Sequence, residues 1–164
     1  MGADHDAEVK SKCLSHQRKH RIADAFRAEW SSVRGEVPLR TIAIVDDEPQ
    51  SQYLYPEFLL YQRLLERAGW RVVIADASSL DLKDDAVFLA DERIDLVYNR
   101  VTDFYLADER HWVLRRAYES GLAVITPHPA AHARWADKRL LAWLGDEALL
   151  QQAGDVLGPA IAAD

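Results

Sequence analysis

The chain has 164 residues, 49% of them hydrophobic, which is enough for one hydrophobic core, and its formal net charge is −7 at pH 7. The acidic balance argues against a nucleic-acid backbone as partner, because such partners bind through summed cationic contacts, and the single cysteine, Cys13, excludes an internal disulfide. No apolar run approaches the roughly 20 residues of a membrane helix, and the N-terminus is too polar for a signal peptide, so we expect a cytoplasmic protein with no membrane partner.

The chain divides into an extension, one domain and a tail. Residues 1–24 lack a sustained apolar period and are interpreted as a variable N-terminal extension that is flexible or helical. The stretch from Ile22 to Trp30 carries apolar side chains at helical spacing and predicts a short amphipathic helix. Residues 25–150 are interpreted as the domain, and residues 151–164 form a tail that ends in small residues.

Four buried strands alternate with helices along the domain. Continuous apolar, β-branched runs are typical of strands covered on both faces, and they occur at residues 41–45, 71–75, 94–98 and 122–126. Helices are predicted at residues 56–68, 108–120 and 130–144, and the segment between the second and third strands is interpreted as a polar connection. This alternation predicts an α/β fold of Rossmann-like type, with an open parallel sheet of about four strands and helices on both faces.

Polar residues follow each predicted strand. In such folds ligands bind beyond the carboxyl ends of the strands, an edge that here collects Asp46 to Glu48, Asp76, Asn99 to Asp103 and Thr126 to His128. An arginine fork beside an amide suits a carboxylate or a phosphate. A small anionic substrate is therefore predicted to bind at Asn99, Arg100, Thr102 and Asp103. The alternative is a network that only fixes the loop, with Arg100 and Asp103 paired to each other.

A metal site is not predicted. His128 and His132 have the i, i+4 spacing of metal ligands, but Pro129 lies between them and no third ligand is obvious. The two histidines are therefore expected to have structural roles.

The acidic turn after the first strand resembles the signature of response-regulator receiver domains. A receiver accepts phosphate on an aspartate that ends its third strand, but this chain has Asn99 there, and a neutral amide cannot form an acyl phosphate. The lysine-proline pair expected after a fifth strand is also absent. A non-catalytic, receiver-like signalling or interaction module is kept as an alternative.

A longer resemblance covers about residues 25–150. The segments that carry it are FRAEW at 26–30, QYLYPEF at 52–58, DLVYNR at 95–100 with TDFYL at 102–106, and TPHP at 126–129 with ADKR at 136–139. Their order and spacing resemble a bacterial family of ATP-grasp-like, carboxylate-amine ligase-like proteins, in the Rossmann-like pre-ATP-grasp domain.

The resemblance implies enzymes that activate a carboxylate as an acyl phosphate, which an amine then attacks. In that superfamily an Asp-Lys pair opens the nucleotide-binding part, and the matching lysine here, Lys138, would contact an ATP phosphate. The other interpretation of Lys138 is a solvated helix residue beside Asp137.

The resemblance stops where the ATP-grasp catalytic lobe would begin. A second phosphate-binding lysine, an adenine pocket and acidic ligands for Mg²⁺ do not follow Lys138. We therefore expect a truncated, catalytically incomplete domain without catalytic residues of its own, for which ATP and Mg²⁺ require a complementary lobe encoded separately. A non-functional gene fragment is the remaining alternative.

Overall fold

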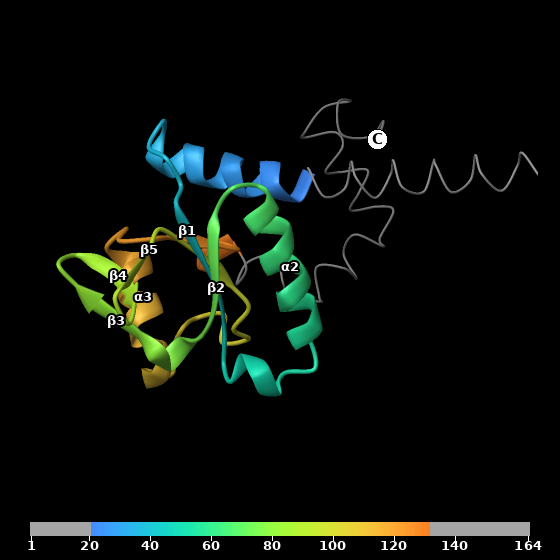
Figure 1. Ribbon diagram of the computed structural model, residues 1–164. Helices are drawn as coiled ribbons and strands as arrows, with labels where there is room; N and C mark the ends of the chain where they lie inside the picture. Colours follow the sequence, from blue (N-terminus) through green and yellow to red (C-terminus); the bar gives the residue numbers. More distant parts are fainter. Residues whose placement is uncertain (1–20, 132–164) are drawn as a thin grey trace, which may run out of the picture.

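A computed structural model describes residues 21–131 of the chain (Figure 1). Its centre is a four-stranded sheet in the order β2-β1-β6-β7, and every neighbouring pair is parallel. The strands are β1 (Thr41–Asp46), β2 (Arg71–Asp76), β6 (Leu96–Asn99) and β7 (Val124–Thr126). The predicted parallel α/β fold is confirmed.

The sheet separates two hydrophobic cores because side chains alternate along β1. Ile42 and Ile44 belong to one core, whereas Ala43 and Val45 belong to the other, as the two-residue period of a strand requires. All six residues of β1 are buried. This pattern explains the continuous apolar run, since a strand covered on both faces has no side for polar residues.

Two helical segments cover the Ile42 face. They are α2 (Tyr55–Arg67) and the helical residues 21–34, which contribute Phe26, Trp30, Phe58 and Leu65 to the core. Figure 1 shows α2 beside β2 and the blue helix at the amino end of β1. The helical residues 21–34 continue across the expected start of the domain at residue 25, and Ala23 is buried.

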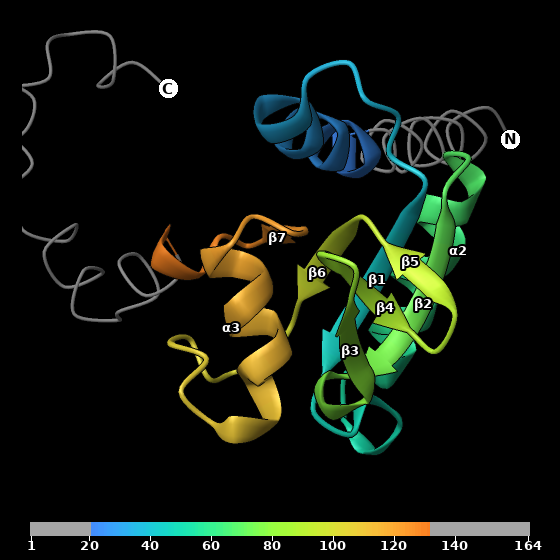
Figure 2. The same ribbon diagram turned by 90° about the vertical axis from the view of Figure 1, so that its left-hand side faces the viewer.

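The opposite face is covered by α3 (Trp112–Glu119) and by a small second sheet, which lie together in Figure 2. Val113, Leu114 and Ala117 have the spacing of one helical face and form the inward side of α3. The helix is preceded by the short 3-10 turn η3 (Glu109–His111), which Asp108 caps by accepting a hydrogen bond from the Arg110 amide at 2.9 Å.

The interpretation of residues 77–93 as a polar connection is wrong. After the turn η2 (Ala77–Ser79), the chain forms an antiparallel sheet of β3 (Leu80–Lys83), β4 (Ala86–Leu89) and β5 (Glu92–Ile94). Asp84 and Asp85, at the first hairpin turn, have φ of 49° and 56°, the left-handed backbone that a tight two-residue turn needs. Leu80, Val87 and Ile94 point from this sheet into the core under α3.

Several predicted bounds change in the structure. Helix α2 begins and ends one residue before the predicted range, after Pro49–Ser51 forms a further turn, η1. Ile94 belongs to β5 rather than to the third long strand, and β7 is confined to the last three residues of its predicted range. The helix predicted at residues 130–144 lies almost wholly outside the described residues. Within residues 21–131 no helix is long and apolar enough to cross a membrane.

Candidate functional site

The candidate site lies where the parallel strands end. Val45 pairs with Asn99 across β1 and β6, and the Arg100 amide donates to the Val45 carbonyl at 2.8 Å. Asp46 is paired with Asp76 on the other side of β1. The structure therefore brings together residues from three segments that are far apart in the sequence, because parallel strands present their carboxyl ends at one edge.

At this edge the Asp76 carboxylate accepts hydrogen bonds from three donors of the protein. Asp76 accepts the Glu48 amide at 2.8 Å through one oxygen, and the Ser78 amide and hydroxyl at 2.8 and 2.6 Å through the other. Burial alone would raise the pKa of Asp76, but these donors favour the carboxylate and leave the pKa below 3.8. Asp76 thus anchors the loop after β1 to the end of β2.

Asp46 has a different environment. Its side chain is buried and accepts the Asp47 amide at 2.9 Å. Burial raises the pKa of Asp46 above 3.8, against the opposing effects of the Asp47 amide and the Arg100 charge. In the part of the chain that the structure describes, no group of three or more His, Cys, Asp or Glu residues is arranged to hold a metal ion.

The most buried polar group here is His111, which is 1% exposed. Its Nε2 lies 2.8 Å from Asp47 Oδ1 and its Nδ1 lies 2.9 Å from Asp103 Oδ2. Because a carboxylate only accepts hydrogen bonds, both ring nitrogens donate when the imidazole is protonated. We call His111, Asp47 and Asp103 the histidine clamp. It ties the loop after β1 to the loop after β6.

The clamp stabilises the charged forms of His111 and Asp103. Burial lowers the pKa of His111, but the hydrogen bonds and charges of Asp47 and Asp103 outweigh it and raise the pKa above 6.5. The pKa of Asp103 is lowered, because the Asp108 amide and His111 more than offset its burial. The Asp108 amide donates to Asp103 at 2.9 Å, so the same carboxylate also fixes the start of η3.

We expect the free energy of unfolding to fall as the pH rises above about 6.5. Unfolded His111 titrates near 6.5 and folded His111 at a higher pH, so the clamp contributes fully below 6.5 and its contribution is lost as the pH rises through the folded pKa. Urea unfolding between about pH 6 and pH 9 measures the loss. The exposed His128 provides the control: His128→Gln should keep this pH dependence, and His111→Gln should reduce it. Equal slopes for wild type and His111→Gln would contradict the clamp.

Arg100 lies at the same edge, and its guanidinium packs against two aromatic rings. Its guanidinium carbon is 5.4 Å from the centroid of the Tyr98 ring and 5.9 Å from that of Phe58, and Nη1 donates to the Tyr98 hydroxyl at 3.2 Å. Burial raises the pKa of Tyr98 to about 12, so its hydroxyl is neutral at physiological pH. The guanidinium is 3.6 Å from Glu57 Oε1 and 26% of the Arg100 side chain is exposed.

The four predicted substrate residues have different environments. Asn99 is buried and its Oδ1 accepts the Val101 amide at 3.1 Å, so it orders the turn. Thr102 is exposed. The alternative pairing of Arg100 with Asp103 is wrong, since Arg100 pairs with Glu57 and Asp103 with His111.

Of three further residues considered from the sequence, Lys138, His132 and His128, the structure describes only His128. Lys138, expected near an ATP phosphate, and His132 lie outside the described residues. His128 Nε2 lies 3.3 Å from the Tyr118 hydroxyl, and the two rings meet edge to face at 4.9 Å between centroids. This contact accords with a structural role for His128.

No family model and no curated protein matches the chain. The candidate site therefore depends on its geometry and on the sequence resemblance. Neither His111 nor the pairing of Arg100 with Glu57 was predicted from the sequence. A usable signal existed, because His111 precedes the buried Leu114 by three residues, which puts both on one helical face.

Proposed function

We propose that the carboxyl edge of the sheet binds a small anionic substrate through Arg100. We further propose that the chain is the substrate-side domain of an ATP-grasp-type, carboxylate-amine ligase-like protein. The observation that carries the first proposal is the Arg100 guanidinium, which is supported by two aromatic rings and partly open to solvent. An arginine held in this way presents its planar donors to a carboxylate or a phosphate at a reduced entropic cost.

The contact between Arg100 and Glu57 is loose enough for an anion to replace it. At 3.6 Å the two groups are farther apart than in a direct hydrogen bond, and 38% of the Glu57 side chain is exposed. An ion pair of this kind contributes little in water, so a ligand that forms a fork of two short hydrogen bonds can displace it. Asp103 is held by His111 at 2.9 Å, so it does not compete with an anion for the Arg100 guanidinium.

The ligase part of the proposal is supported by where the resembling segments lie. QYLYPEF leads into α2 and includes Glu57 and Phe58, while DLVYNR forms β6 and ends in Arg100. TPHP follows β7 at the same edge. Three separate segments thus border one ligand-binding edge.

The described residues do not fit a Mg²⁺ site of their own. Asp76 and Asp103 use their oxygens on amides, hydroxyls or His111, and Asp47 also binds His111. In this proposal Mg-ATP binds to a complementary ATP-grasp lobe, which supplies the phosphoryl group, while this domain binds and orients the substrate.

Arg100→Ala is expected to weaken binding of a small anion by at least about tenfold, the usual loss for a charge-assisted contact. Isothermal titration calorimetry of the full chain with succinate and with inorganic phosphate measures the affinity. The matched control is Arg63→Ala, which removes the same charge from an exposed position on α2. Absence of binding to wild type, or equal loss in the two variants, would contradict the proposed site.

Mg-ATP provides a separate test of the ligase assignment. The chain alone is expected to show no ATP hydrolysis, and addition of a separately encoded ATP-grasp lobe is expected to produce substrate-dependent hydrolysis. Mg²⁺-dependent hydrolysis by the chain alone that is lost in Lys138→Ala would contradict the need for a second lobe. Phosphorylation of an aspartate by a small phosphodonor would instead favour the receiver-like alternative.

A further inference from the structure

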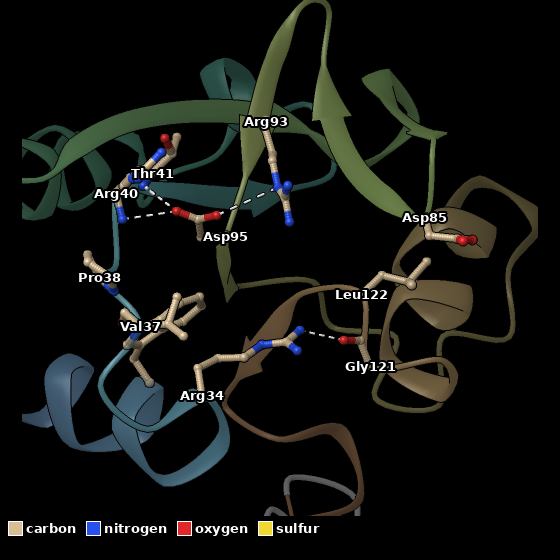
Figure 3. A pocket seen from close by; sticks show the side chains of 11 residues that line it. Arg34, Val37, Pro38, Arg40, Thr41, Asp85, Arg93, Asp95, Gly121 and Leu122 are labelled. Atoms are coloured by element: carbon tan, nitrogen blue, oxygen red, sulfur yellow. Dashed lines mark hydrogen bonds and ion pairs between the residues drawn. The ribbon is translucent and has the colours of Figure 1, made fainter.

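A cavity lined by polar and apolar residues lies at the opposite, amino end of the parallel strands (Figure 3). Its volume is about 640 Å³, within the range of small-molecule sites. It is bordered by the end of the helical residues 21–34, the segment that leads into β1, the start of β6 and the turn before β7. Nothing in the proposed function uses this cavity, which we call the arginine cleft.

Arg93 of β5 contributes to the arginine cleft a guanidinium that has few partners among residues 21–131. Its side chain is 66% exposed. Its Nε lies 3.9 Å from Asp95 Oδ1, which is an ion pair beyond hydrogen-bond distance. Asp95 also contacts the backbone, because its Oδ2 accepts hydrogen bonds from the amides of Arg40 and Thr41 at 2.9 and 3.1 Å. Asp95 therefore holds β6 to β1 and neutralises Arg93 only partly.

Arg34 enters the same space from the helical residues 21–34. Nη2 of Arg34 donates to the Gly121 carbonyl, and its guanidinium carbon lies 6.0 Å from the centroid of the Trp30 ring. This hydrogen bond occupies one of five guanidinium N–H groups. Figure 3 shows the guanidinium groups of Arg34 and Arg93 directed into the space that Leu122 borders, while the Asp85 carboxylate points away from them.

The geometry points to a binding site for a phosphate monoester with an apolar body. We infer that the phosphate lies between Arg34 and Arg93, since a dianion matches two guanidinium groups and accepts several of their free N–H donors. Beside these charged groups and the carboxylates of Asp85 and Asp95, the lining has an apolar part that includes Val37, Pro38 and Leu122. A ligand that carries an anion and an apolar group satisfies both kinds of lining, whereas inorganic phosphate uses only the first.

The test uses phenyl phosphate, inorganic phosphate and phenol with the full, ¹⁵N-labelled chain. Phenyl phosphate is expected to shift the backbone amide signals of Gly121 and Leu122 in a saturable manner, with an affinity at least about fivefold higher than either of the other two compounds. Arg93→Gln is expected to weaken this binding by about tenfold. Arg93 is suited to the test because its exposed side chain supports no part of the core.

Two control variants, Arg63→Gln and Arg100→Ala, separate this site from the carboxyl edge. Arg63→Gln, with the same loss of charge at an exposed position of α2, is expected to leave the Gly121 titration unchanged, and so is Arg100→Ala. Charge reversal in Arg93→Glu is expected to abolish phenyl phosphate binding, while amide spectra without ligand confirm that the variant is folded. Absence of a saturable shift at Gly121 and Leu122, or equal affinity of wild type and Arg93→Gln, would overturn the inference, even if Arg100 binds succinate as proposed.

Discussion

His111→Ala is expected to lower the free energy of unfolding by about 3 kcal/mol, the lower part of the range for a broken buried ion pair. The substitution removes a buried cation that hydrogen-bonds Asp47 at 2.8 Å and Asp103 at 2.9 Å. The two carboxylates would remain without the cation, and a cavity would form where the imidazole packs. Asp47 and Asp103 are about a quarter exposed, so water screens part of the remaining repulsion.

Urea unfolding at about pH 6, where the clamp is charged, measures this loss. His128→Ala is the matched control, since His128 is exposed and contacts Tyr118 only through one hydrogen bond at 3.3 Å and an edge-to-face ring contact. We expect its loss to stay below about 1 kcal/mol. A double variant, Asp47→Asn with Asp103→Asn, should reduce the cost of His111→Ala, because the unpaired charges are then gone. A His111→Ala variant as stable as His128→Ala would show that the clamp does not hold the two loops.

The parallel sheet could be predicted because each of its strands has a simple sequence pattern. Residues 41–46 are buried on both faces, so the apolar run is continuous, and Gly69, with φ of 100°, ends the helical segment before β2 as glycine commonly does. Pro56 and Glu57 fit the first turn of α2 for equally local reasons. Local chemistry thus determines these bounds to within a residue or two.

The antiparallel sheet could not be recognised as readily, because its turns lack the usual glycine. Asp84, Asp85 and Ala90 adopt positive φ values that glycine or asparagine commonly supply. The boundary between β5 and β6 could not be recognised from the sequence either, because Ile94 and Leu96 are both fully buried but belong to different sheets. Only Asp95 separates them, and its carboxylate binds two backbone amides rather than solvent.

The edge that carries the candidate site was predicted, but its pairings were not. Strand order places Asp46, Asn99 and Arg100 together whatever their side chains do. Which acid pairs with which base depends on loop conformation and on an element such as η3, whose position follows from tertiary packing. The spacing of His111 from Leu114 places both on one helical face, but nothing near His111 in the sequence indicates which carboxylates it meets.

Phe58→Ala is expected to cost about 3–5 kcal/mol of unfolding free energy, the usual loss for a fully buried phenylalanine. Phe58 is 0% exposed and packs in the core between α2 and the sheet. The matched control on the same helix is Leu60→Ala, because Leu60 is 64% exposed and its truncation should change stability by less than about 0.5 kcal/mol. Urea unfolding at fixed pH compares the two variants, and a similar loss in both would contradict the packing of α2.

Phe58 also connects the core to the candidate site, and a milder substitution separates the two roles. Phe58→Leu keeps most of the apolar contact but removes the ring that lies 5.9 Å from the Arg100 guanidinium carbon. A cation-π contact at a partly exposed site contributes about 0.5–1 kcal/mol, so succinate binding should weaken by roughly twofold to fivefold in a folded variant. Unchanged affinity in Phe58→Leu would mean that Tyr98 alone supports the guanidinium. Weakened affinity would mean that the packing of α2 sets the orientation of Arg100, and that the core and the anion site are parts of one arrangement.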